Sequence, residues 1–82
     1  MSASTKATLV ESLNALLAER ALPPPATWDD ATVLFGEKSI GLDSLDMAVL
    51  SSQLEARLGR DPYSRGQFPR TLGELLQFYA SP

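Results

Sequence analysis

The chain has no cysteine and no histidine among its 82 residues. Without cysteine it can form no disulfide, and it has no thiolate of its own for chemistry. Without histidine it lacks the side chain that most often serves as a general base or a metal ligand. We therefore expect that the chain is not an enzyme and that it holds no metal ion.

Basic residues are too few to give the chain a positive surface. Ten Asp and Glu residues against seven Lys and Arg residues give a formal net charge of −3. Because nucleic-acid binding requires a positive surface that neutralises phosphates, we expect no nucleic-acid partner. Residues 1–58 hold eight of the ten acids, whereas residues 59–82 carry three arginines and two acids. A partner steered by charge is thus expected to be basic and to approach the first part of the chain.

Long apolar runs are also missing. Crossing a membrane takes about 20 consecutive apolar residues, and the chain has no such stretch. Residues 1–8 are mostly small and polar and lack the apolar core of a secretory signal. We therefore expect a cytoplasmic protein with no membrane partner. A chain of 82 residues has room for one compact domain with a small core, so residues 1–82 are predicted to form a single domain and a monomer.

Three segments carry apolar residues at helical spacing. The first, residues 4–21, ends before three consecutive prolines at positions 23–25, which cannot continue a helix. The second, residues 44–58, is followed by Gly59, a residue typical of helix C-termini. The third spans residues 71–80. These patterns predict three longer helices with a long connection between the first two.

Shorter signals complete the predicted fold. Thr71 and Glu74 have the spacing of a capping box, in which each would bond the backbone N–H of the other. Proline suits the first turn of a short helix over residues 62–65, and Thr27 and Asp30 are expected to cap a turn in the long connection. No alternating pattern is long enough to predict a strand. The predicted fold is all-α, a bundle of three longer helices and one short helix.

One segment, Gly41-Leu42-Asp43-Ser44-Leu45, stands where the long loop is predicted to turn into the second helix. It can be interpreted as helix capping, because Asp43 and Ser44 are both good N-caps and Asp46 lies in the first turn, where negative charge is favourable. Capping accounts for many Asp-Ser pairs, and the tripeptide Asp-Ser-Leu occurs by chance in roughly a few per cent of chains this long. The tripeptide alone therefore indicates little.

In its context, the segment resembles the signature of the acyl and peptidyl carrier proteins. That family has Gly-x-Asp-Ser-Leu at the start of the second helix of a four-helix bundle, and the order of the predicted elements matches over most of this chain. The resemblance implies that a phosphopantetheinyl transferase attaches 4′-phosphopantetheine covalently to Ser44, flanked by Asp43 and Leu45. Its phosphodiester would lie near the free N–H groups of a helix N-terminus. The thiol of the arm would carry acyl or aminoacyl groups as thioesters.

The resemblance also implies partner enzymes. An acyltransferase or an adenylation enzyme would load the thiol, and downstream synthase enzymes would receive the cargo; the residues leave both loading routes open. In the family the second helix is the docking face, which here would use Asp46, Ala48, Val49, Ser52 and Glu55. For Leu45 and Val49, core packing is an equal alternative. Asp46 and Glu55 are equally compatible with solvated surface.

The second helix departs from that of fatty-acid carriers, which is markedly acidic. Here Ala48 and Val49 occupy its middle, and Arg57 offsets Glu55. We therefore expect a free-standing carrier of polyketide, nonribosomal-peptide or hybrid biosynthesis, of the kind that makes antibiotics. Fatty-acid synthesis stays an alternative. Another is a helical protein-interaction module without a prosthetic group, in which Ser44 is only a helix cap.

Overall fold

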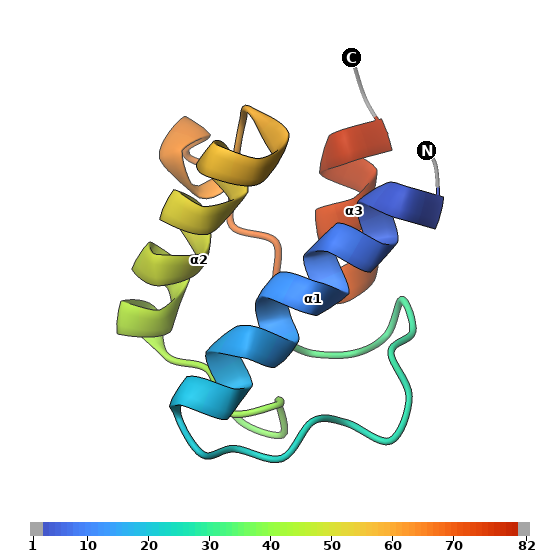
Figure 1. Cartoon of the computed structure of the whole chain (residues 1–82), viewed down its shortest axis with the longest axis vertical. Helices are drawn as coiled ribbons and strands as arrows, with labels where there is room; N and C mark the ends of the chain where they lie inside the picture. Colours follow the sequence, from blue (N-terminus) through green and yellow to red (C-terminus); the bar gives the residue numbers. More distant parts are fainter. Residues whose placement is uncertain (1–2, 81–82) are drawn as a thin grey trace.

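The computed structural model describes residues 3–80, which form a compact unit whose regular elements are all helical (Figure 1). Three α-helices and one 3-10 turn follow one another: α1 (Ala3–Glu19), α2 (Ser44–Leu58), η1 (Tyr63–Arg65) and α3 (Leu72–Ala80). Between residues 3 and 80 there is no strand, only two isolated β-bridges. In this range no helix combines the length and the apolar character needed to cross a membrane.

The ends of the helices follow local backbone chemistry. α1 ends two residues earlier than predicted, because Ala21 has φ of +55°, outside the right-handed helical region. α2 has its predicted bounds and ends at Gly59, whose N–H donates to the carbonyl of Glu55 (3.0 Å) at φ of +82°. The predicted short helix over residues 62–65 is only the 3-10 turn η1, which Gly66 ends at φ of +81°.

Leucines from the three helices form one hydrophobic core, and α1 packs against both α2 and α3 (Figure 1). The long connection between α1 and α2 adds Leu34, Phe35 and Leu42 to this core. Each fully buried leucine contributes about 1.5–3 kcal/mol relative to an exposed one, so these contacts decide how the helices meet. The fully buried leucines of the helices are Leu9, Leu13, Leu17, Leu50, Leu54, Leu72 and Leu75.

The long connection contains several turns and is tied to the start of α3 by backbone hydrogen bonds. The N–H of Leu34 donates to the carbonyl of Arg70 (2.7 Å), and the N–H of Leu72 donates to the carbonyl of Thr32 (3.0 Å). The expected cap by Thr27 and Asp30 is wrong. Instead the turn is closed by their neighbours, because Asp29 Oδ1 accepts the N–H of Ala31 (2.9 Å) and Thr32 Oγ1 accepts the N–H of Asp29 (3.0 Å).

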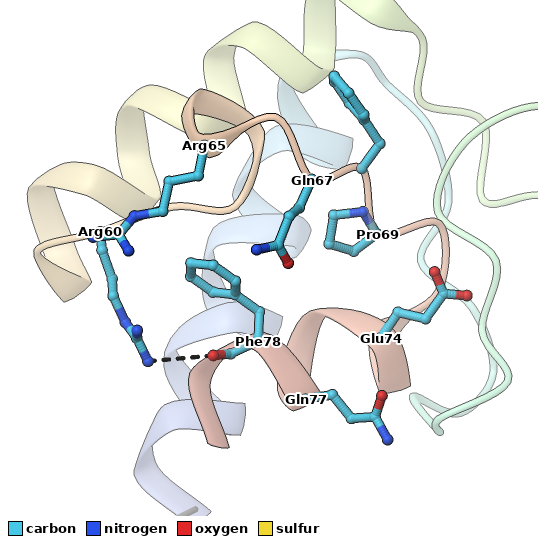
Figure 2. Close-up of a pocket in the computed structure, with 8 residues that line it drawn as sticks. Arg60, Arg65, Gln67, Pro69, Glu74, Gln77 and Phe78 are labelled. Atoms are coloured by element: carbon cyan, nitrogen blue, oxygen red, sulfur yellow. Dashed lines mark hydrogen bonds between the residues drawn. The ribbon is translucent and has the colours of Figure 1, made fainter. Parts of the chain in front are cut away.

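Only one of the two hydrogen bonds of the capping box predicted for α3 is present. Thr71 Oγ1 accepts the N–H of Glu74 (3.1 Å), but Glu74 Oε1 accepts the N–H of Arg70 (3.2 Å) rather than that of Thr71. The other end of α3 is held by Arg60, which donates to the carbonyl of Phe78 (3.2 Å; Figure 2). These contacts fix both ends of α3 against the segment that precedes it.

Candidate functional site

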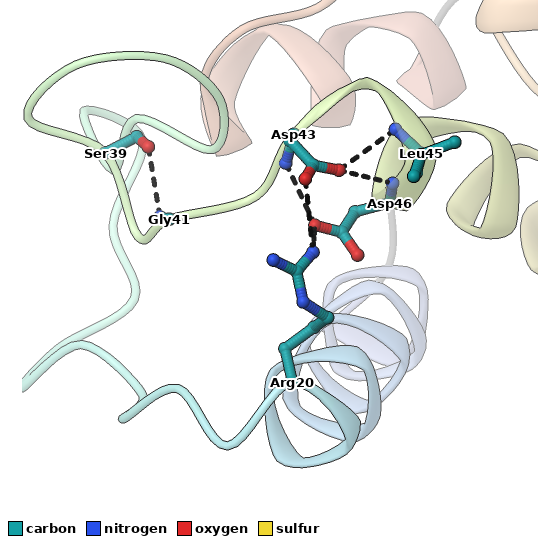
Figure 3. A network of polar contacts seen from close by, with 6 residues as sticks. All are labelled: Arg20, Ser39, Gly41, Asp43, Leu45 and Asp46. Carbon is teal, nitrogen blue, oxygen red and sulfur yellow. Dashed lines mark hydrogen bonds and ion pairs between the residues drawn. The ribbon is translucent and has the colours of Figure 1, made fainter.

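Two aspartates cap the N-terminus of α2 reciprocally (Figure 3). Asp43 Oδ1 accepts the N–H groups of Leu45 (3.0 Å) and Asp46 (3.1 Å), and Asp46 Oδ2 accepts the N–H of Asp43 (2.9 Å). Ser44, the first helical residue, is exposed, and its hydroxyl makes no hydrogen bond within residues 3–80. The N-cap is therefore Asp43, and the interpretation of Ser44 as the cap is wrong.

The chain that leads to Ser44 is held by the preceding loop. Gly41 has φ of +105°, and a Cβ there would lie 3.2 Å from Leu22 Cδ1, so glycine suits both the backbone and the space. Ser39 Oγ accepts the N–H of Gly41 (3.0 Å; Figure 3). Leu42 is buried in the core and forms a parallel β-bridge with Phe35. These anchors fix the position from which Ser44 projects.

Asp46 is turned inward to an ion pair with Arg20, which follows α1 (Figure 3). Arg20 Nη1 also lies 3.4 Å from Asp43 Oδ2. Asp46 is only 4% exposed, so both its predicted role in docking and its interpretation as solvated surface are wrong. The role of Arg20 could not be predicted from the sequence, because 26 residues separate it from Asp46 and no local pattern links the two.

The site contains no side chain prepared to activate Ser44. The N–H of Asp46 and the guanidinium of Arg20 hold the pKa of Asp43 below its ordinary value, which makes this carboxylate a weak base. Asp46 is already engaged with Arg20 and the backbone. Within the described residues, no three Asp or Glu side chains cluster to hold a metal ion. A reaction at the Ser44 hydroxyl would thus need a base from another protein.

The Ser44 hydroxyl is accessible, but the N–H groups around it are not. The N–H groups expected to face a phosphodiester there are largely occupied, because Asp43 accepts two of them. The helix dipole and the Arg20 cation remain as the favourable charges near the site. The structure thus shows an accessible hydroxyl beside a capped helix end, rather than an open anion-binding helix terminus.

An exposed stripe runs along α2 from the residue after Ser44. Leu45 is 76% exposed and Val49 43% exposed, so core packing is wrong for both. Arg57 pairs with Glu11 of α1 (3.0 Å). We refer to the exposed residues at helical spacing as the α2 stripe: Leu45, Ala48, Val49, Ser52 and Glu55.

The structure brings Asp43, Ser44 and Leu45 together at the start of α2, with the rest of the α2 stripe beyond them and Asp46 on the inner side. No protein-family model matches the chain, and comparisons with curated proteins and with solved structures find no match. Function is therefore inferred from the residues themselves and from their arrangement around Ser44.

Proposed function

We propose that this protein is a carrier that holds acyl or aminoacyl groups as thioesters on a 4′-phosphopantetheine arm attached to Ser44. The supporting observation is that Ser44 is exposed and that its hydroxyl makes no hydrogen bond within residues 3–80, although it stands beside Asp43, which caps the helix. A serine that served only as a cap would accept N–H groups from the first turn, and here Asp43 accepts them. The Gly41-Leu42-Asp43-Ser44-Leu45 segment adds its resemblance to the carrier signature.

The chemistry of the chain agrees with a carrier that other enzymes act upon. Neither carboxylate near Ser44 is prepared to take its proton, so a phosphopantetheinyl transferase would supply the base. The chain has no cysteine, so the thiol that bears the cargo would come from the arm. An acyltransferase or an adenylation enzyme would then form the thioester, and downstream synthase enzymes would receive the group.

The α2 stripe is the docking surface in this proposal. Leu45 and Val49 offer apolar side chains next to Ser44, and Glu55 adds a negative charge farther along the helix. Apolar contacts in its centre would select partners by shape more than by charge. A stripe that is neutral in its middle favours a carrier of polyketide or nonribosomal-peptide biosynthesis over one of fatty-acid synthesis.

Attachment is tested by incubating the protein with coenzyme A and a phosphopantetheinyl transferase of broad specificity, followed by intact-mass measurement. We expect the wild type to gain the mass of one arm and Ser44→Ala to gain none. Ser64→Ala, which removes another exposed serine, should load like the wild type. A wild type that stays unmodified while a known carrier is loaded, or a full gain on Ser44→Ala, would refute the proposal.

Docking is tested separately by the initial rate of the same reaction. Leu45→Gln should slow loading several-fold without lowering its final extent, because it removes an apolar contact and leaves Ser44 in place. The matched control is Ala15→Gln, which changes an exposed apolar side chain of α1, outside the α2 stripe. Equal rates for Leu45→Gln and the wild type would exclude Leu45 from docking.

A further inference from the structure

A groove of about 450 Å³ lies between α3 and the segment that leads from η1 to it (Figure 2). η1, which contributes Arg65 to the groove, follows the C-terminal end of α2, the helix that begins at Ser44. Arg60 and Arg65 lie at one end of the groove and Glu74 at the other (Figure 2). We refer to it as the basic groove, lined among others by Arg60, Arg65, Phe68, Pro69, Glu74 and Phe78.

The arginine end of the basic groove is built to meet negative charge. The Arg60 guanidinium lies 4.8 Å from the centroid of the Phe78 ring and donates to the Phe78 carbonyl (3.2 Å), so its position is fixed. Arg65 is exposed, and its side chain makes no hydrogen bond or ion pair in the part of the chain that the structure describes. The protein carries a net charge of −3, and residues 1–58, which hold eight of its ten acids, would attract a basic partner. The arginine end of the basic groove would instead attract an acidic ligand.

An aromatic side chain stands at the rim of the same groove. Phe68 is 63% exposed, although the next residue, Pro69, is buried and its carbonyl accepts the hydroxyl of Tyr63 (3.2 Å). The backbone that carries Phe68 is therefore anchored to the core. Exposed aromatic side chains next to arginines are typical of the residues that dominate protein–protein binding energy.

We propose that the basic groove binds an acidic segment of a partner protein. A carboxylate of the segment pairs with Arg65, and a neighbouring aliphatic or aromatic side chain covers Phe68. A small acid held by the arginines would leave the Phe68 ring in water, whereas a peptide segment reaches both. This inference does not depend on Ser44.

The proposal is tested by titrating the ¹⁵N-labelled full chain at low salt with an acetylated, amidated hexapeptide of alternating glutamate and leucine. We expect chemical-shift changes concentrated on residues 65–70 and on α3, with millimolar or tighter affinity. Arg65→Gln and Phe68→Gln should each weaken binding by about fivefold or more. Arg57→Gln is the matched control: it removes the same charge from an exposed site on α2 and should leave binding unchanged.

Four results would overturn the proposal. The first is the absence of shifts in the groove at millimolar peptide. The second is equal binding of a peptide with glutamine in place of glutamate, because charge would then play no part. The third is equally tight binding of phenylacetate, which would indicate a small-molecule site. The fourth is a set of groove shifts that grow with protein concentration alone, because the occupant would then be a second copy of the chain.

Discussion

Arg20 and Asp46 form an ion pair that joins the turn after α1 to the first turn of α2. The same carboxylate oxygen of Asp46 accepts the backbone N–H of Asp43 (2.9 Å). One buried side chain thus connects the end of α1, the cap of α2 and, through that cap, the residue before Ser44. The orientation of the proposed attachment site is set by a contact between distant parts of the chain.

Arg20→Gln should lower the free energy of unfolding by more than Arg57→Gln does. The substitution removes the ion-pair partner of the buried Asp46 carboxylate. Hydrogen bonds to charged groups contribute more to stability than hydrogen bonds between neutral groups. Arg57→Gln is the control, because its partner Glu11 is exposed and such surface pairs contribute about 0–1 kcal/mol. Urea unfolding at pH 7 gives both values. Equal losses would show that the Arg20 pair is no more than a surface contact.

Asp43→Ala and Ser44→Ala should differ in stability although the residues are neighbours. Asp43→Ala should lower the free energy of unfolding, because it removes the cap of α2. Ser44→Ala should change it by no more than about 0.5 kcal/mol, because the Ser44 hydroxyl makes no hydrogen bond within residues 3–80. Thermal or urea unfolding of both variants compares them directly. A larger loss for Ser44→Ala would return Ser44 to the role of a cap and weaken the proposed function.

Ser12→Ala should stabilise the protein or leave its stability unchanged. Ser12 is fully buried in α1, and its hydroxyl has no hydrogen-bond partner among residues 3–80, so it is desolvated without compensation. Ser51→Ala is the matched serine, since Ser51 Oγ donates to the buried carboxylate of Asp61 (2.8 Å). Its loss should cost about 1–2 kcal/mol, as for other hydrogen bonds to charged groups. A clear loss of stability in Ser12→Ala would reveal a partner for this hydroxyl.

Local patterns predicted the three long helices, because apolar spacing, the prolines at 23–25 and Gly59 act within a few residues. Predictions failed where neighbouring residues of the same types could make the same hydrogen bonds, and where a contact joins distant segments of the chain. Asp29 and Thr32, rather than Thr27 and Asp30, close the turn, and the sequence offers no reason to prefer either pair. The burial of Asp46 depends on Arg20, which only the fold brings near. The sequence shows the arginines of residues 59–82 but not the basic groove, because only the fold brings Arg60 and Arg65 beside Glu74 and Phe78 of α3.

Stability should fall above about pH 10, because burial raises the pKa of both tyrosines in the folded protein. The pKa of Tyr79 rises to about 12, and that of Tyr63, whose hydroxyl donates to the carbonyl of Pro69, also rises. In the unfolded chain a tyrosine ionises near pH 10. As the pH rises through about 10–12, the unfolded state therefore loses protons first and becomes favoured.

Urea unfolding across pH 8 to 12, followed in parallel by tyrosinate absorbance, measures this effect. The chain has only two tyrosines, so the double variant Tyr63→Phe/Tyr79→Phe should be less stable at pH 8, through its two lost hydrogen bonds, but less sensitive to alkali. Its stability curve should therefore approach that of the wild type as the pH rises. Tyrosinate that appears near pH 10 while the protein is still folded would contradict the raised pKa values, because both hydroxyls would then be in contact with water.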